Sequence, residues 1–104
     1  MAGPKRPVIW SPEARDDLSA IYGYYIGVAG RNTADDIIRS IVGACHLLEA
    51  HPFAGRSRNE IRAGLRSVVA SPYVVFYRVS KDEVAEIVRV LDGRQDIEEI
   101  FLAD

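Results

Sequence analysis

The chain has 104 residues, of which 48% are apolar and 27% are charged, and this size and composition predict one soluble globular domain covering residues 1–104. Its single cysteine excludes an intramolecular disulfide, so we expect a cytoplasmic protein. Its longest apolar run, residues 73–77, is far shorter than the ~20 residues that span a bilayer, so we expect no membrane segment. The formal net charge of -2 argues against a general nucleic-acid binder.

The beginning of the chain predicts a short strand that leads directly into a helix. Residues 8–10 are apolar, and Ser11-Pro12-Glu13 is typical of a helix start, with a serine cap, a proline in the first turn and a carboxylate near the positive end of the helix dipole. Ala29-Gly30 predicts the end of this helix. Its apolar stripe consists of Ala14, Leu18, Ile21, Tyr25 and Val28.

A second helix is expected after a tight turn, so that the two helices form a hairpin. Residues 32–36 (Asn-Thr-Ala-Asp-Asp) carry a capping signature, and His51-Pro52 predicts the helix end. The apolar positions at helical spacing are Ala34, Ile37, Ile38, Ile41, Cys45 and Leu48. Cys45 is therefore expected in the core.

The second half of the chain predicts three strands after an arginine-rich loop at residues 52–64. Runs of β-branched and aromatic residues at Leu65–Ser71, Tyr73–Ser80 and Val84–Leu91 indicate an antiparallel meander. The order strand, helix, helix, strand, strand, strand predicts an α+β fold. In this fold the antiparallel helical hairpin packs on one face of a small antiparallel sheet.

The middle strand is apolar on both of its faces. Tyr73, Val75, Tyr77 and Val79 lie on one face, and Val74 and Phe76 lie on the other. One helical layer covers only one face of a sheet, and sheets with one solvated face alternate more cleanly than this. We therefore expect a protein partner on the second face; the alternative is that loops and the first strand cover it.

No metal or cofactor site is expected. The candidate metal ligands Cys45, His46, Glu49 and His51 all lie on the second helix, where Cys45 belongs to the core stripe and His46 points about 100° away from it. The chain also lacks a glycine-rich phosphate loop and a nucleophile elbow. Catalysis through a metal, a cofactor or a nucleophilic residue therefore has no support in the sequence.

The basic residues are unevenly distributed. Arginine, which pairs in bidentate fashion with carboxylates and phosphates, accounts for 11 of the 13 basic residues. Residues 56–94 carry 8 basic and 5 acidic side chains, whereas residues 95–104 carry 4 acidic and no basic ones. The arginines expected on the sheet, which would stabilise the charge in RNA cleavage, are Arg66, Arg78, Arg89 and Arg94. The candidate side chains are poorly suited to proton transfer near neutral pH, because both histidines lie on the second helix and a tyrosine such as Tyr77 has an ordinary pKa of ~10. No catalytic residue is therefore assigned.

Several strings of the sequence, in their order and spacing, resemble the ParE branch of the ParE/RelE toxin superfamily. They are Trp10-Ser-Pro-Glu-Ala-Arg-Asp-Asp-Leu, Pro52-Phe-Ala-Gly-Arg-Ser-Arg-Asn-Glu, Gly64-Leu-Arg-Ser, Tyr73-Val-Val-Phe-Tyr-Arg and Arg89-Val-Leu-Asp-Gly-Arg-Gln-Asp. The resemblance extends from about residue 8 to residue 97. Many relatives have His-Gly-Arg where Asp92-Gly-Arg stands here, and this change removes a histidine near Arg94.

The resemblance implies a bacterial toxin of a type II toxin–antitoxin system, neutralised by a ParD-like antitoxin. ParE-like members are similar to inhibitors of DNA gyrase, whereas RelE-like members cut messenger RNA on the ribosome. We therefore expect a binding inhibitor of DNA gyrase rather than an enzyme, without sequence-specific nucleic-acid binding by the toxin alone. The alternatives are a ribosome-dependent endonuclease with Tyr77 as proton carrier, and a degenerate toxin that retains only antitoxin binding.

Two sets of contact residues are expected. The antitoxin should bind exposed apolar and arginine side chains of the sheet together with one tyrosine of the first helix: Tyr24, Arg58, Arg66, Tyr73, Phe76, Arg78, Arg89 and Arg94. The apolar side chains of the acidic last ten residues should share in target contact: Ile97, Ile100 and Phe101. The alternative for this segment is a docked terminus, helix or strand, that only completes the fold.

Overall fold

The computed structural model describes residues 5–103, so residues 1–4 and 104 of the predicted domain lie outside the described residues. The elements are β1 (Ile9–Trp10), α1 (Pro12–Ala29), α2 (Arg31–Ala50), β2 (Arg56–Ser57), β3 (Arg66–Ala70), β4 (Tyr73–Val79), β5 (Ala85–Asp92) and α3 (Ile97–Ala103). The predicted α+β order of one strand, two helices and three strands is confirmed. The short strand β2 lies where the sequence predicts only a loop. None of the helices within residues 5–103 is long and apolar enough to cross a membrane.

The two long helices are joined through Gly30. Ser11 caps α1 as predicted, because its Oγ accepts a hydrogen bond from the Ala14 amide at 3.0 Å. The same hydroxyl donates to the Val88 carbonyl at 2.9 Å and so ties the helix start to the sheet. Gly30 has a φ of 88°, a conformation that favours glycine, and α2 begins at Arg31 without a side-chain cap. The predicted cap at residues 32–36 is therefore wrong, because the glycine turn lets the helix start earlier.

The sheet has the strand order β1-β5-β4-β3-β2. Strands β2 to β5 pair antiparallel with their neighbours, which confirms the predicted meander. Strand β1 pairs parallel with β5, with Trp10 opposite Ile87, so the whole sheet is mixed rather than antiparallel. A register shift in the pairing of β4 with β5 lies between Phe76 and Tyr77.

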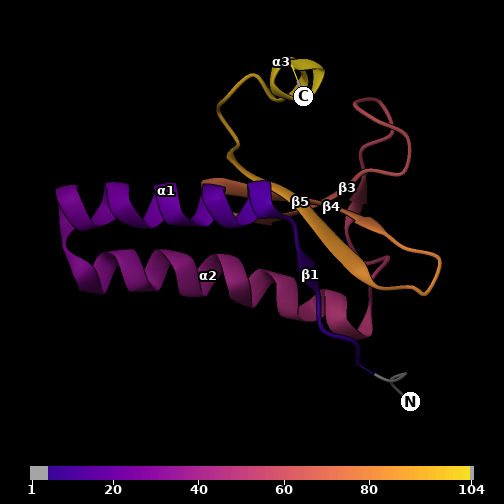
Figure 1. The fold of residues 1–104 in the computed structure, drawn as a ribbon, viewed down its shortest axis with the longest axis horizontal. Coiled ribbons are helices and arrows are strands. Elements are labelled where there is room, and N and C mark those ends of the chain that lie inside the picture. Colours follow the sequence, from indigo (N-terminus) through magenta and orange to yellow (C-terminus); the bar gives the residue numbers. More distant parts are fainter. Residues whose placement is uncertain (1–4, 104) are drawn as a thin grey trace.

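The helical hairpin covers one face of the sheet (Figure 1). The stripes of α1 and α2 pack against alternate side chains of β3, β4 and β5. The core on this face includes Ala14, Ile41, Cys45, Leu48, Val75, Tyr77 and Ile87. Val28, the last member of the predicted α1 stripe, is exposed instead, because the closed end of the hairpin projects beyond the sheet (Figure 1).

The opposite face of the sheet is partly covered by the chain itself. Leu65, Phe76 and Leu91 form a second apolar cluster with Phe101 of α3. The rings of Phe76 and Phe101 meet edge to face with their centroids 5.2 Å apart. Phe76 is therefore covered by α3 and the loop before β3, whereas the expectation of a protein partner on the rest of this face stays a prediction.

Candidate functional site

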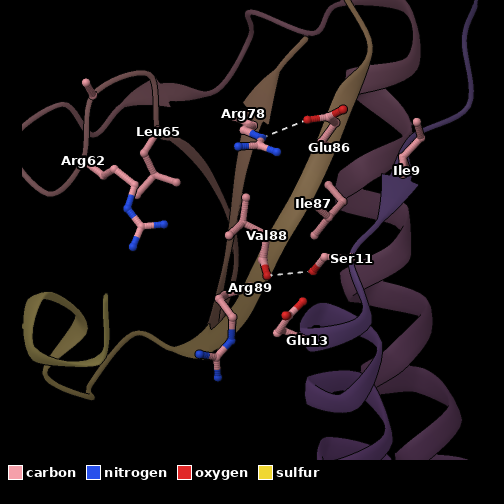
Figure 2. A pocket seen from close by; sticks show the side chains of 11 residues that line it. Ile9, Ser11, Glu13, Arg62, Leu65, Arg78, Glu86, Ile87, Val88 and Arg89 are labelled. Carbon is pink, nitrogen blue, oxygen red and sulfur yellow. Dashed lines mark hydrogen bonds and ion pairs between the residues drawn. The ribbon is translucent and has the colours of Figure 1, made fainter. Parts of the chain in front are cut away.

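A groove of about 630 Å³ lies on the part of the second sheet face that α3 leaves open (Figure 2). It is bounded by β1 and the start of α1 on one side and by the loop before β3 on the other, and it crosses β4 and β5. Val88 provides apolar surface in its centre, and Leu65 lies beside Arg62 on the loop side (Figure 2). The charged side chains around them are Glu13, Arg62, Arg78, Glu86 and Arg89.

Four of the arginines expected to bind the antitoxin are already paired with carboxylates of the chain. The pairs are Arg58 with Glu60 at 2.9 Å, Arg78 with Glu86 at 2.8 Å, Arg89 with Asp17 at 2.8 Å and Arg94 with Asp92 at 2.6 Å. The side chains of Arg78 and Arg94 remain 69% and 81% exposed. An incoming carboxylate therefore has to share or displace an existing partner at each of the four positions.

Arg89 and Asp17 form a bridge between the sheet and α1. Arg89 donates to the Asp17 carboxylate through Nε at 2.8 Å and Nη2 at 3.0 Å, and the Val90 amide donates to the same carboxylate at 2.8 Å. Both side chains are mostly buried. A bidentate, partly desolvated pair of this kind fixes geometry. Arg89 therefore lines the groove and at the same time positions α1 on β5.

Asp92 binds Arg94. Its carboxylate accepts hydrogen bonds from Arg94 Nε at 3.0 Å, Nη2 at 2.6 Å and the Arg94 amide at 2.9 Å. The side-chain hydrogen bond from Arg94 is the main cause that lowers the pKa of Asp92 to about 2. Asp92 thus engages Nε and Nη2 of Arg94, while most of the Arg94 side chain stays exposed.

Arg58 and Arg66 lie beside β2, away from the groove lining. Arg66 donates to the carbonyl oxygens of Phe53 at 3.2 Å and Gly55 at 2.7 Å, and its guanidinium lies 5.2 Å from the centre of the Phe53 ring. Arg58 lies 5.5 Å from the centre of the Phe76 ring. Arg66 therefore holds the loop after α2 against the sheet, whereas Arg58 packs on Phe76 of β4.

Two aromatic residues expected as exposed antitoxin contacts are buried. Tyr73 lies on the helical face, where its hydroxyl donates to the Tyr25 hydroxyl at 3.4 Å and where burial raises its pKa. Phe76 belongs to the cluster beneath α3. The prediction that these two side chains offer an exposed surface is wrong, because each packs under a helix. Tyr24, in contrast, is 62% exposed on α1.

The C-terminal helix completes the fold, as the alternative reading of the last ten residues predicts. Phe101 is buried, and Ile97 and Ile100 are partly buried against the same cluster, so the three predicted target contacts face inward. Leu102 is 85% exposed and is a large apolar side chain that α3 presents to solvent. Arg62, which the sequence does not single out for the site, stacks 5.0 Å from the Phe101 ring centre and donates to the Phe101 carbonyl at 3.2 Å.

Tyr77, the proton carrier of the ribonuclease alternative, is fully buried. Its hydroxyl donates to the Pro52 carbonyl at 2.8 Å and accepts from the Gly55 amide at 2.8 Å, and burial raises its pKa. His46 and His51 belong to α2 and its C-terminal cap, on the helical side. Within residues 5–103, no three His, Cys, Asp or Glu side chains are grouped as a metal ion would require.

A helical hairpin packs on one face of a five-stranded sheet, and a groove lined by charged side chains lies on the other face. A solved chain titled "Chromosomal ParDE TA system from P. aeruginosa" shares this fold with a TM-score of 0.73 at 24% identity, covering 85% of this chain and 96% of that chain. Residues 8–97 match the family "ParE toxin of type II toxin-antitoxin system, parDE". Toxin ParE1 of Mycobacterium tuberculosis is 33% identical over 88 residues, or 85% of this chain and 90% of the relative. Toxin ParE3 of Caulobacter vibrioides is 32% identical over 90 residues, or 86% and 89%. The chain belongs to the ParE toxin family.

Proposed function

We propose that this ParE-type toxin acts in the cytoplasm by binding DNA gyrase and blocking its cycle, and that a ParD-like antitoxin neutralises it. The observation that favours binding over catalysis is the burial and hydrogen bonding of the Tyr77 hydroxyl. RNA cleavage requires a group that exchanges a proton with the reacting oxygen. The Tyr77 hydroxyl is buried and engaged by Pro52 and Gly55, so it does not reach a substrate on the surface.

The antitoxin contacts are proposed from exposure. Tyr24, Arg78 and Arg94 present most of their side chains to solvent, whereas Tyr73 and Phe76 do not. Tyrosine and arginine are enriched in protein interfaces. Replacing Tyr24 with alanine should therefore weaken antitoxin binding, measured by calorimetry, more than it lowers the thermal unfolding midpoint. The reverse order would assign Tyr24 to the fold.

The target contact is proposed for the outer side of α3. Because Phe101 holds α3 in the second cluster, truncation after Arg94 removes part of the core and should destabilise the chain. Leu102→Glu is the sharper variant, since its side chain is exposed. It should reduce gyrase inhibition while thermal stability and antitoxin binding stay unchanged. Unchanged inhibition would assign α3 a purely structural role.

The experiment that tests the proposed function is a reconstituted supercoiling assay with purified gyrase, toxin and relaxed plasmid. The toxin should inhibit supercoiling, the antitoxin should restore it, and messenger RNA on translating ribosomes should remain uncut. Codon-dependent RNA cleavage with intact gyrase activity would establish the ribonuclease alternative. No effect in either assay, with antitoxin binding retained, would identify a degenerate toxin.

A further inference from the structure

Strand β2 covers the outer edge of β3 over only part of its length. Its two residues pair with Arg66 and Ser67, and no strand of the described chain continues along this edge beyond Ser67. Residues 68–70 pair with β4 on their other side. The sheet therefore ends in an open edge at residues 68–70.

The open edge offers both backbone hydrogen-bonding groups of Val69. The Leu65 carbonyl accepts a hydrogen bond from the Arg58 amide at 2.7 Å, so Leu65 directs its backbone groups toward the β2 side. Successive residues of an antiparallel strand direct these groups to alternate sides. Ser67 and Val69 therefore face the same side as Leu65. Because β2 has ended at this point, the Val69 N–H and C=O point out of the sheet.

Residues 68–70 lack the usual protection of an open edge. Proteins commonly shield a free edge with a charged side chain, a proline or a β-bulge, because its unpaired groups bind further strands. Residues 68–70 are Val-Val-Ala, and their register with β4 has no shift. The whole stretch of residues 67–77 carries no charge, and the Val69 side chain is 69% exposed. The open edge is therefore able to pair with a further strand.

The helix that packs on β3 has an uncharged flank. Its residues recur at helical spacing along one side of α2: Thr33, Ile37, Ser40, Ala44 and Leu47. Ile37 and Ala44 pack, together with Val68 of the open edge, against the core on the helical side of the sheet. The opposite flank of α2 faces α1, where Asp35 accepts a hydrogen bond from Tyr22. The open edge and the uncharged flank of α2 together are called the uncharged border.

We propose that two copies of this chain associate about a two-fold axis at the uncharged border, where the open edges pair antiparallel and the sheet continues from one copy into the other. A two-fold axis places surface residues near their own copies, so charged side chains there would meet like charges. The uncharged border avoids this repulsion. The Val69 N–H and C=O then bond to the second copy rather than to water.

A second copy fits the uncharged border better than an acidic peptide or a nucleic acid does. Carboxylates and phosphates bind cationic side chains, whereas residues 67–77 and the uncharged flank of α2 contain none. The groove on the second face lies elsewhere, because none of its lining residues belongs to the uncharged border. Pairing of the open edges therefore leaves the groove of each copy accessible.

Sedimentation velocity of the purified toxin without antitoxin, over a wide range of protein concentration, tests the proposal. The wild type should pass from monomer to dimer as its concentration rises. Val69→Lys places like charges across the axis and should weaken dimerisation by about tenfold or more. Val28→Lys is the matched control, because Val28 is 63% exposed at the closed end of the hairpin (Figure 1) and should dimerise as the wild type does. Thermal midpoints verify the fold of both variants.

Amide hydrogen exchange of the wild type gives a measurement that needs no variant. The Val69 amide should exchange more slowly at high than at low protein concentration, whereas the Val68 amide, which faces β4, should stay protected at both. Should Val69→Lys fail to fold, a Val69 exchange rate independent of concentration would overturn the proposal.

Two further results would contradict the dimer. They are a wild type that stays monomeric at every concentration and a folded Val69→Lys variant that dimerises as the wild type does. A monomeric wild type whose antitoxin binding Val69→Lys weakens would assign the open edge to a strand of the antitoxin instead. Gyrase inhibition is measured separately, because the dimer does not depend on the identity of the target.

Discussion

Replacing Tyr77 with phenylalanine separates a structural tyrosine from a catalytic one. The substitution removes a single hydroxyl that donates to Pro52 and accepts from Gly55, each at 2.8 Å. Each lost hydrogen bond lowers the free energy of unfolding by about 1 kcal/mol. The Pro52 carbonyl and the Gly55 amide are left without this partner, and this lowers the free energy of unfolding further where they stay buried. We expect a total loss of about 2–4 kcal/mol, which lowers the melting temperature of a domain of this size by about 8–16 °C.

Urea denaturation of wild type, Tyr77→Phe and Tyr25→Phe measures this effect. Among residues 5–103, the Tyr25 hydroxyl accepts one long hydrogen bond of 3.4 Å, from Tyr73, so its loss should lower stability by less than about 1 kcal/mol. Below its melting temperature, folded Tyr77→Phe should inhibit gyrase as wild type does. A Tyr77→Phe variant with wild-type stability and no toxicity would refute the reasoning, because the hydroxyl would then act outside the fold.

Three further predictions concern carboxylates and the buried thiol. In urea denaturation, Asp17→Asn should lower the free energy of unfolding by about 1–3 kcal/mol, because it breaks the partly buried pair with Arg89. Asp16→Asn is the exposed control and should change the free energy of unfolding by less than about 0.5 kcal/mol. Burial raises the pKa of Cys45 from 9.0 to about 12, so between these pH values the folded state keeps a proton that the unfolded state loses. The free energy of unfolding should therefore fall as the pH rises from 9.0 toward 12. Cys45→Ala should show a smaller decline over this range. Asp92→Asn should release Arg94 and tighten binding of an acidic antitoxin segment in calorimetry, whereas unchanged affinity would mean that Arg94 lies outside the interface.

The elements specified by local patterns are the ones that sequence predicts well. The cap at Ser11 and the stripe at helical spacing depend on neighbouring residues, so α1 and most of α2 follow from the sequence. The alternation of Phe76 and Tyr77 likewise predicts that β4 has two apolar faces. What covers each face depends on residues distant in the chain, and for this reason the packing of Phe101 on Phe76 is not predictable from either segment.

The candidate site is less predictable than the fold, because the role of an arginine depends on its partner. Arg89 and Asp17 meet only after α1 packs on β5, and no spacing rule links them. The same argument applies to Arg62, which gains its place in the groove by stacking on Phe101. Sequence therefore identifies the arginine-rich face, whereas the structure separates arginines that hold the fold from those that remain exposed.

The central claim, inhibition by binding rather than by catalysis, is tested most directly by titrating toxin against a fixed amount of gyrase in the supercoiling assay. A binding inhibitor reaches full inhibition only when toxin equals or exceeds gyrase, and the inhibited fraction does not grow with longer incubation. An enzyme turns over, so substoichiometric toxin would inactivate its target completely with time. The proposed function predicts the stoichiometric, time-independent curve, and progressive inactivation by trace toxin would contradict it.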